Sequence, residues 1–527
     1  MPDEGKGDTS KGHRLMSPKA ALSVANGVIG AILSTAALVF IAQNMGPTAL
    51  GVLGYAMALI GLMSFLSDFG VGSVHANFIR RGEDLGKCVG AYALIKILLL
   101  VIFSTFAYVI IEMWKGFEMG GAITHSDAMI DSLHSFLMYY ILLGISQIAT
   151  HTFDAQGAVA KVHVPALLEV VVRVSFITFV ATTAYKSSPE GPALLAASYV
   201  GGIIASMLLV ALLMVKVPVK RPDRETLMKY IRGLAPVFVV SMIIILDLYL
   251  DKAVVGYFWG ETEVGLYFGV QKMAVFVGVF SLSVATLILP SVTTYFTRKE
   301  VATSWEVVNQ AERYVSLIVI PTAAFYLTFG SQIIDVFLTG EFASAVRTMD
   351  VLVISSTVVA LVLPLRSAIA GVGKMETLFF IGLGGLAVQM AAMTVLVPER
   401  LFGVEMLGLG SFGAGVSLLI FSVYYFFVLR YMAWKQARIV PNSRSFKHIL
   451  SAVVMVGVMY TVKWVLIPTV DWLALVTLAV VGTVAYGITA YLIGELDASD
   501  YREFRRLLNP QNTMQYVVNE LLGKRSQ

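Results

Sequence analysis

Apolar runs of about twenty or more residues recur from one end of this chain to the other, and they limit what it can fold into. A helix of about 20 apolar residues crosses the ~30 Å hydrocarbon layer of a bilayer. Only 14% of the 527 residues are charged and 57% are hydrophobic, whereas soluble domains carry about 25% charged residues. So little charge cannot cover a globule of this size. We therefore predict an all-α, polytopic membrane protein.

Hydropathy along the chain predicts fourteen transmembrane spans. The first apolar run is too long for the core of a signal peptide, so we interpret it as an uncleaved first span. The single cysteine, Cys88, excludes an intrachain disulfide. The predicted spans are 20–43, 50–76, 88–112, 131–153, 162–185, 191–215, 233–257, 264–295, 314–338, 348–372, 376–397, 404–429, 448–468 and 471–494.

Lys and Arg are unevenly distributed over the predicted loops. With the N-terminus inside, 28 of the 38 fall in inner segments and six within spans, and the outer loops hold only Lys115, Lys186, Arg347 and Arg400. Basic loops are retained on the cytoplasmic side of a membrane. We therefore predict a multi-pass protein of the plasma or inner cell membrane, with both termini cytoplasmic. A missed helix would move later basic loops outside, so the asymmetry also supports the span count.

Two glycine-flanked turns indicate an internal repeat. "GPTALG" (46–51) returns as "GETEVG" (260–265), with three identities and one Leu/Val exchange in six positions. Each lies in an outer turn between two predicted spans, and the offset of six spans preserves orientation. Transporters commonly place a midplane site between two repeats of this kind. We predict two six-helix lobes as parallel pseudo-repeats plus two C-terminal helices, and two unrelated glycine turns are the alternative.

This organisation predicts six consecutive segments. They are a cytoplasmic N-terminal tail (1–19), an N-lobe with spans 1–6 (20–215), a cytoplasmic inter-lobe linker (216–232), a C-lobe with spans 7–12 (233–429), a linker with spans 13 and 14 (430–494), and a cytoplasmic C-terminal tail (495–527).

Several stretches resemble one family of transporters. They are "MGPTALGVLGYAMALIGLMSFLSDFGVGSVHANFIRR", "LDLYLDKAVVGYFWGETEVGLYFGVQKMA", "ERYVSLIVIPTAAFYLTFGSQIIDVFLTGEFASA" and "MDVLVIS". The pattern, over roughly residues 20–435, is similar to the polysaccharide-biosynthesis branch of the MOP superfamily, with its Wzx-like oligosaccharide-lipid flippases. Multidrug MATE exporters and lipid II flippases belong to the same superfamily. The resemblance implies two lobes around a central cavity, export of lipid-linked oligosaccharides by alternating access, and a monomer.

Nine of the charged residues inside predicted spans are candidate site residues. A charge at the bilayer centre costs at least ~2.5–3.5 kcal/mol, so such groups face a cavity or a partner. We predict the cations as substrate-binding residues and the acids as candidates for ion coupling or ion pairing. The cations are Lys96, Arg173, Lys252, Lys272 and Arg366, and the acids are Asp68, Glu169, Asp247 and Asp251.

The spacing of these residues leaves two interpretations open in each lobe. Glu169 and Arg173 are four residues apart and share a helix face, so they form a self-neutralising pair or both face the cavity. Asp247 and Asp251 also share a face, as ion-pair partners of neighbouring helices or as a site for H⁺ or Na⁺. The adjacent Lys252 completes an acidic–basic pair that matches one in the similar family.

Asp68 lies near the inner end of the second predicted span. A pair with Arg80 or Arg81 in the following loop is its structural interpretation, and ion coupling is the functional one. The corresponding place in the second half, "SLSVA" (281–285), holds no acid. A symmetric role of this acid in the two halves is therefore not expected.

The charges favour an anionic cargo. An oligosaccharide on a polyprenyl phosphate or diphosphate is such an anion. The resemblance to the fourteen-span lipid II flippases implies that spans 13 and 14 flank its tail. The chain lacks a phosphate-binding Gly-rich loop and a metal-ligand spacing of its histidines. We therefore predict no cofactor, no metal, no nucleic-acid partner and no enzymatic activity, with energy from H⁺ or Na⁺, the membrane potential or the substrate gradient.

Three other functions remain as alternatives to this prediction. A MATE-like multidrug or cation antiporter would favour an acidic cavity and usually twelve spans. A lipid II flippase differs mainly in its substrate. A membrane-embedded polysaccharide polymerase or glycosyltransferase would need catalytic groups in a sizeable outer loop, and the longest one here (114–130) offers little beyond "ITHSDAMID".

Overall fold

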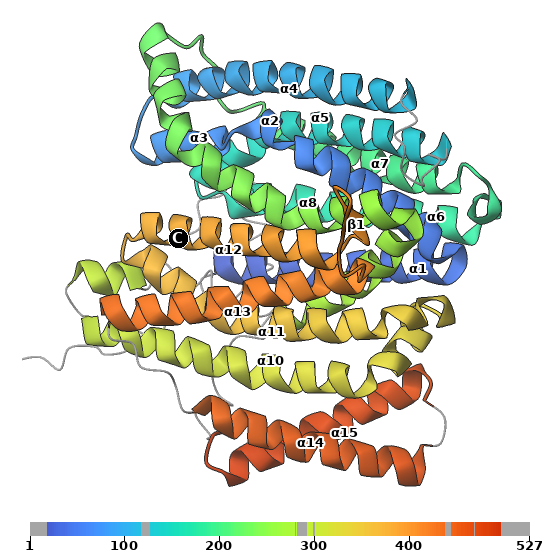
Figure 1. Ribbon diagram of the computed structural model, residues 1–527. Helices are drawn as coiled ribbons and strands as arrows, with labels where there is room; N and C mark the ends of the chain where they lie inside the picture. Colours follow the sequence, from blue (N-terminus) through green and yellow to red (C-terminus); the bar gives the residue numbers. More distant parts are fainter. Residues whose placement is uncertain are drawn as a thin grey trace, which may run out of the picture.

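The computed structural model confirms the predicted all-α architecture (Figure 1). It describes residues 18–116, 127–279, 281, 292–298, 301–437, 444–467 and 470–496. The helices of the first half are α1 (Pro18–Met63), α2 (Phe65–Asp68), α3 (Val71–Arg80), α4 (Leu85–Gly116), α5 (Asp127–Ala155), α6 (Val159–Thr182) and α7 (Gly191–Met214).

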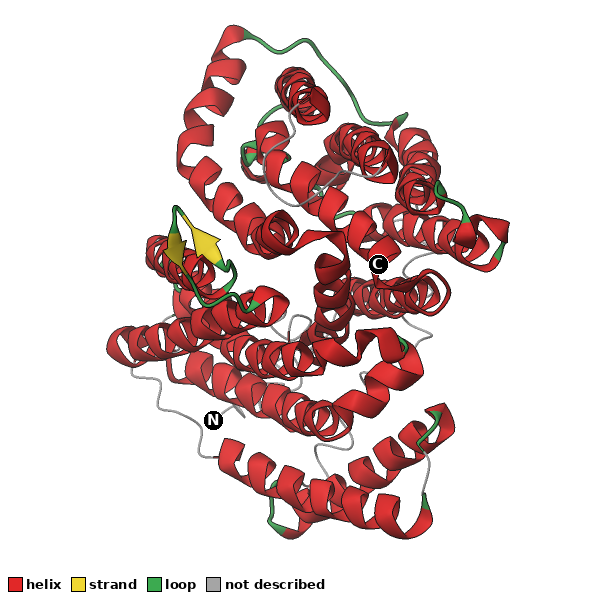
Figure 2. Cartoon of the chain, turned by 45° about the vertical axis from the view of Figure 1, so that its right-hand side comes forward, coloured by secondary structure: helices red, strands yellow, loops and turns green. Residues whose placement is uncertain are grey.

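The second half continues with α8 and α10 to α15. Its helices are α8 (Arg224–Val275), α10 (Val301–Phe337), α11 (Val346–Gly371), α12 (Met375–Leu396), α13 (Gly410–Ala437), α14 (Arg444–Leu466) and α15 (Trp472–Leu492). Short 3₁₀ helices occupy Ala184–Ser187, Phe276–Gly278 and Gly340–Ala345. Figure 2 shows a small hairpin of β1 (Arg400–Leu401) and β2 (Val404–Glu405) against these helices.

The number of spans is compatible with the predicted fourteen. Eleven helices in the described residues are long and apolar enough to cross a membrane, or up to twelve if the bent pair in α8 is one span. However, α1 has 46 residues and α8 has 52, so each would be roughly 70 Å long or more if straight. Both are broken by a glycine in a non-helical conformation, Gly46 in α1 and Gly260 in α8. If α1 and α8 each cross the membrane twice, the twelve candidate spans become fourteen.

The two glycine turns of the repeat have matching structures. Gly46 has φ 75° and ψ −176°, and Gly260 has φ 83° and ψ −178°. Glycine adopts this positive φ without the steric cost of a Cβ. Beside these turns, the hydroxyl oxygens of Thr48 and Thr262 lie 2.9 Å apart. The two threonines are 214 positions apart, as are the two glycines, so each meets its own counterpart.

Reciprocal contacts of α1 with α8 confirm the pseudo-repeat. A Cβ on Gly51 would collide with the backbone carbonyl of Glu261, and a Cβ on Gly265 would collide with that of Pro47. These four positions form two equivalent pairs under the 214-residue offset. Small residues allow such close approach of helices in a membrane. The lobes therefore meet tightly at this end of the bundle, around a pseudo-two-fold axis.

The structure breaks the helix of the second predicted span, 50–76. α2 ends at Asp68, and Phe69 (φ 45°) and Gly70 (φ 76°) both adopt the left-handed region before α3 begins. Likewise, α8 begins at Arg224, nine residues before the predicted span 7. The Asp223 side chain caps it by accepting a hydrogen bond from the Thr226 backbone N–H, which satisfies a free donor of the first turn.

The two C-terminal helices form a separate layer on the C-lobe. In Figure 1, α14 and α15 lie beyond α10, at the bottom of the view, and both contact α10. Their shared core includes Leu317 and Phe329 of α10, Met455 and Met459 of α14, and Leu478 of α15. This layer matches the two additional helices predicted after the lobes.

Candidate functional site

Arg173 presents a guanidinium group toward the first helix of the N-lobe. It lies in the middle of α6 and is 8% exposed. Its Nε donates to Glu169 Oε1 at 2.7 Å, so the pair predicted from the i, i+4 spacing is present. The guanidinium also stacks on the Tyr199 ring, 4.6 Å from its centroid, and a terminal nitrogen is 3.5 Å from Ser34 Oγ of α1.

In the C-lobe, Asp251 and Lys252 form a closed network. Their side chains are buried, and the Lys252 Nζ lies 2.8 Å from Asp251 Oδ1 and 3.0 Å from Gln271 Oε1. Tyr267 donates to the other Asp251 oxygen at 2.8 Å, and Gln271 at 2.6 Å. The break at Gly260 folds the two arms of α8 together, which places these four side chains side by side.

Tyr267 and Gln271 were missed by the sequence analysis. They are four residues apart on the span that follows Gly260, a spacing typical of polar side chains on one helix face. A search for neutral polar pairs inside spans would have found them.

Lys272 differs from Lys252 although both lie on α8. Its side chain is exposed, and in the described residues it makes no ion pair; its Nζ lies 5.3 Å from the Phe268 ring. It interacts electrostatically with Lys252 and with Arg173 of the other lobe. Two cations from different lobes therefore lie within electrostatic range of one another, with Asp251 of the C-lobe acting on Lys272 as well, and like charges repel more strongly in a medium of low dielectric constant.

Arg366 and Asp247 extend this group of charges within the C-lobe. Both side chains are exposed although each lies inside a membrane-spanning helix, α11 and α8 respectively. Asp247 interacts electrostatically with Arg366 and with the Asp251–Lys252 pair. Tyr425 of α13 also interacts electrostatically with both charged groups. Arg366 and Asp247 are thus opposite charges on neighbouring helices that do not form a closed pair.

We call these residues the interface charges, because electrostatic contacts link them from one lobe to the other. Four cations outnumber three acids by one. The cations are Arg173, Lys252, Lys272 and Arg366, and the acids are Glu169, Asp247 and Asp251.

The fifth predicted cation, Lys96, lies elsewhere. It is fully buried inside the N-lobe, where its Nζ donates to Asp68 Oδ1 and to Gln147 Oε1, both at 2.8 Å. The structure therefore pairs two of the predicted site residues with each other and away from the interface charges.

The predicted pairing of Asp68 with Arg80 or Arg81 is wrong. Asp68 pairs with Lys96, and Arg80 pairs with Asp154 of α5 at 3.1 Å. The reason is the break after α2, which redirects the chain so that α3 carries Arg80 away from Asp68 toward the end of α5.

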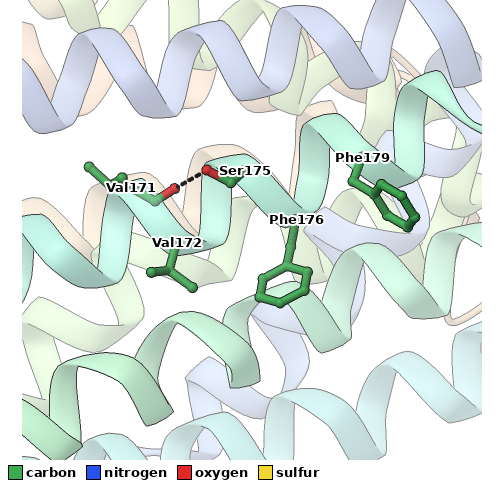
Figure 3. Close-up of a pocket in the computed structure, with 5 residues that line it drawn as sticks. All are labelled: Val171, Val172, Ser175, Phe176 and Phe179. Atoms are coloured by element: carbon green, nitrogen blue, oxygen red, sulfur yellow. Dashed lines mark hydrogen bonds between the residues drawn. The ribbon is translucent and has the colours of Figure 1, made fainter.

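An apolar groove follows the outer face of the helix that carries Arg173. It is a shallow, open hollow of about 410 Å³, lined by Val171, Val172, Ser175, Phe176 and Phe179 (Figure 3). The Ser175 hydroxyl donates to the Val171 carbonyl of its own helix, so its lining offers no free polar group. Such a groove suits a hydrocarbon chain and not a charged headgroup.

Metal-binding clusters are not found in the described part of the chain. No group of three or more His, Cys, Asp or Glu side chains is placed there to hold a metal ion.

Comparisons with known proteins identify the family. A model of the family described as polysaccharide biosynthesis protein matches residues 19–292, just over half of the 527 residues. The "Probable low-salt glycan biosynthesis flippase Agl15" of Haloferax volcanii is 22% identical over 400 residues, covering 75% of this chain and 78% of that protein.

Solved transporter structures share the fold. The lipid II flippase MurJ in an inward closed conformation superposes with a TM-score of 0.70 at 14% identity, covering 90% of this chain and 98% of MurJ. An inward-facing multidrug MATE transporter of the MOP superfamily gives 0.61 at 15% identity, covering 81% and 100%. This multi-pass membrane protein therefore belongs to the polysaccharide biosynthesis protein family.

Proposed function

We propose that this protein moves an anionic oligosaccharide, linked to a polyprenyl phosphate or diphosphate, from the inner to the outer leaflet by alternating access. Its product would serve cell-surface polysaccharide or glycan synthesis. The observation that carries the proposal is that Lys272 of one lobe lies within electrostatic range of Arg173 of the other, without an ion pair of its own in the described residues. The family and the glycan-biosynthesis relative support a sugar-bearing lipid as the cargo.

The two cations would divide the recognition of the phosphate. Guanidinium presents several N–H donors in a planar fork that matches phosphate oxygens, whereas ammonium acts as a compact point charge. Arg173 is held in orientation by Glu169 and Tyr199, and Lys272 is accessible. A phosphate between them would relieve their repulsion and hold the headgroup between the lobes, where it can be carried across by their rocking motion.

The hydrocarbon tail would remain in the bilayer throughout. The groove of Figure 3 lies on the same helix as Arg173 but on its apolar face, so a tail can follow α6 while the headgroup is held inside. The layer of α14 and α15 is a second apolar surface for a long tail. With the headgroup inside and the tail in the bilayer, the tail needs no water-filled path.

In the proposed orientation both termini are cytoplasmic, so the turns at Gly46 and Gly260 face outward. The contact of Thr48 with Thr262 would then hold the two lobes together at the outer end, as an inward-facing state requires. We propose that the protein works as a monomer, without enzymatic chemistry, and draws energy from H⁺ or Na⁺, the membrane potential or the substrate gradient.

A MATE-like cation antiporter is the second candidate, because a MATE transporter shares the fold over 81% of this chain. The excess of one positive charge among the interface charges disfavours a cationic drug in the same place. An anionic cargo accounts for that excess.

The test is reconstitution of the full chain in liposomes with a polyprenyl-diphosphate-linked sugar in the inner leaflet. Its appearance outside is followed with an impermeant reagent that modifies the sugar. Wild type is expected to translocate it, and Lys272→Gln to do so far more slowly. Lys186→Gln removes an exposed cation outside the interface charges and serves as the matched control. Proton-linked efflux of a cationic dye, with no movement of the lipid-linked sugar, would overturn the proposal in favour of the antiporter.

A further inference from the structure

We propose that the C-lobe carries a subsite for a neutral sugar beside the turn at Gly260. The subsite, which we call the rim hollow, is an open hollow of about 340 Å³, lined by Phe258, Trp259, Glu399 and Arg400. Small-molecule sites span about 300–1,000 Å³, so one or two sugar rings are a suitable occupant. The inference rests on the proposed function for the side of the membrane and for the origin of the sugar, an oligosaccharide that leaves the lobe interface.

The chain segment that forms one wall of the rim hollow is longer in the C-lobe than in the N-lobe. α6 ends at Thr182 and α12 ends at Leu396, 214 positions later, so the offset of the repeat holds up to this point. The next helix begins at Gly191 in the N-lobe and at Gly410 in the C-lobe, 219 positions later. The connection in the C-lobe is therefore five residues longer, and it contains the hairpin of β1 and β2.

The lining residues also differ from those at equivalent positions of the N-lobe. At the offset of 214, their counterparts are Asn44, Met45, Tyr185 and Lys186. The backbone is nevertheless similar, because a Cβ on Gly191 would lie 2.8 Å from the Met45 side chain, and one on Gly410 would lie 3.3 Å from the Trp259 ring. The combination of an indole, a carboxylate and a guanidinium is thus specific to the C-lobe.

Trp259 is held in one orientation at the base of the rim hollow. Its Nε1 donates to the Val397 carbonyl at 2.8 Å. Gly410, with φ 55°, lies so close to the two bridging carbons of the indole that a side chain there would crowd the ring. The rest of the half-buried ring stays accessible. A pyranose presents one face of C–H bonds, and such a face packs on the electron-rich face of an aromatic ring.

The hairpin supplies polar groups that are available to hydroxyls. Glu399 and Arg400 are both exposed, and the Glu399 carboxylate makes no hydrogen bond or ion pair in the described residues. Arg400 makes a 3.4 Å contact with Glu405, its partner across the hairpin. The Met406 N–H donates to the Glu399 carbonyl at 2.8 Å, which fixes the base of the hairpin. A carboxylate accepts and a guanidinium donates hydrogen bonds, so the two together can bind neighbouring hydroxyls of one ring.

The charges around the rim hollow favour a neutral sugar over an acidic one. Arg400 is accompanied by the carboxylates of Glu399 and Glu405, and Glu263 of α8 accepts a hydrogen bond from the Ser411 N–H nearby. Negative charge is therefore in excess, and like charges repel. In the part of the chain that the structure describes, these carboxylates form no group that could hold a metal ion. A phosphate would be repelled here, so it would bind at the interface charges instead.

The rim hollow lies beside the place where the two lobes meet. Trp259 directly precedes Gly260, and Thr262 of the same turn contacts Thr48 of the N-lobe at 2.9 Å. In the proposed orientation this is the outer end of the protein. A sugar that emerges when the lobes part there passes the rim hollow first. Binding at this subsite would disfavour its return to the lobe interface.

The experiment measures sugar binding to the purified full chain, without transport. Saturation-transfer difference NMR reports which C–H protons of a weakly bound saccharide touch the protein. The probes are soluble neutral oligosaccharides of hexose and of N-acetylhexosamine, and an oligosaccharide of uronic acid. Wild type is expected to give signals from the C–H protons of a neutral sugar, and weaker signals from the uronic acid.

Two variants remove the two kinds of contact. Trp259→Ala is expected to lose the sugar signals, because it removes the stacking surface. Glu399→Ala/Arg400→Ala is expected to weaken them, and it keeps the test valid if Trp259→Ala does not fold, since both side chains are exposed.

Matched controls come from the other lobe and from the C-terminal layer. Tyr185→Ala/Lys186→Ala changes the equivalent exposed positions of the N-lobe. Trp464→Ala removes an exposed tryptophan of α14. Both are expected to keep the wild-type signals. The proposal is overturned if wild type gives no signal with any neutral sugar, if the Glu399/Arg400 double variant gives the wild-type signals, or if the uronic acid gives the strongest ones.

The two proposals fail separately. Wild type that binds a neutral sugar at the rim hollow but moves no lipid-linked sugar in liposomes retains the subsite and loses the proposed cargo. Wild type that moves the lipid-linked sugar but gives no saccharide signals retains the cargo and loses the subsite.

Discussion

Lys96 in the N-lobe and Lys272 in the C-lobe show two ways to hold a cation inside a membrane protein. Lys96 is fully buried and bonded to one carboxylate and one amide oxygen. Lys272 is accessible, lacks an ion pair in the described residues and interacts electrostatically with Arg173 of the other lobe. In the first arrangement, partners inside the protein neutralise the charge. In the second, the charge stays accessible to a ligand. Burial and partners, and not the residue type, therefore separate an internal cation from one that can bind cargo.

The largest effect is expected from Asp68→Ala, because it leaves Lys96 buried without its carboxylate. Removing one partner of a buried ion pair costs about 3–5 kcal/mol. Thermal unfolding of the detergent-solubilised protein should show a large loss of stability. The double variant Asp68→Ala/Lys96→Met should recover most of it. An Asp68→Ala protein as stable as wild type would show that Lys96 is not confined as the structure has it.

The next effect is expected from Lys272→Gln, and it concerns transport alone. A hydrogen bond to a charged group contributes about 1.5–3 kcal/mol, so translocation of a polyprenyl-diphosphate-linked sugar should fall roughly tenfold to a hundredfold. Stability should stay near that of wild type because the side chain is accessible. Equal transport by Lys272→Gln and wild type would remove Lys272 from the cargo site.

Exchange of lysine for arginine should sharpen the contrast. Lys272→Arg keeps the charge at an accessible place and should retain most transport. Lys96→Arg inserts a larger group into a fully packed site, and overpacking costs about 1–3 kcal/mol. Unfolding temperatures and transport rates of both variants give the comparison. Similar losses of stability in the two variants would contradict the difference in burial.

The smallest effect on stability is expected at the exposed ion pairs that connect the segment before α8 with the start of α4. The Lys220 ammonium donates to Asp84 at 2.7 Å and lowers the pKa of that carboxyl below its ordinary value. Lys87 and Thr226 lower the pKa of Asp223 in the same way. A carboxyl with a lowered pKa contributes stability above its unfolded pKa and loses it as pH falls through the folded value.

Lys220→Ala should therefore change the unfolding temperature slightly at neutral pH and not at all at a pH well below 4. High salt should weaken the difference, since exposed ion pairs are screened. Unfolding scans at several pH values and salt concentrations measure it. If the difference in unfolding temperature between Lys220→Ala and wild type grew on acidification, it would contradict the stabilising pair of Lys220 with Asp84.

The sequence predicted the fold better than the pairings. Long apolar runs determine helical spans regardless of distant contacts, and the six-residue echo located the two turns at Gly46 and Gly260. Glu169 and Arg173 were predictable as a pair because four residues on one helix fix their separation. The partner of Asp68 was not, because it depends on a backbone break in which Phe69, and not only Gly70, is left-handed.

The interface charges were identified as individual residues but not as a group. Which of the five basic residues inside predicted spans would be accessible depends on how α6, α8 and α11 pack. Residue spacing along one helix does not predict that packing. Whether these residues bind cargo stays a prediction.

The contact between Thr48 and Thr262 has a consequence for how this protein can change over time. In an ancestor with one repeat, two copies would have assembled as a homodimer, and this threonine would have met itself across the symmetry axis. Fusion of the two copies would then have freed the halves to diverge, and Asp68 has no acidic counterpart at 281–285. On the axis that freedom is restricted, because a bulky or charged replacement at either position meets an unchanged counterpart. The two positions are expected to change together or not at all.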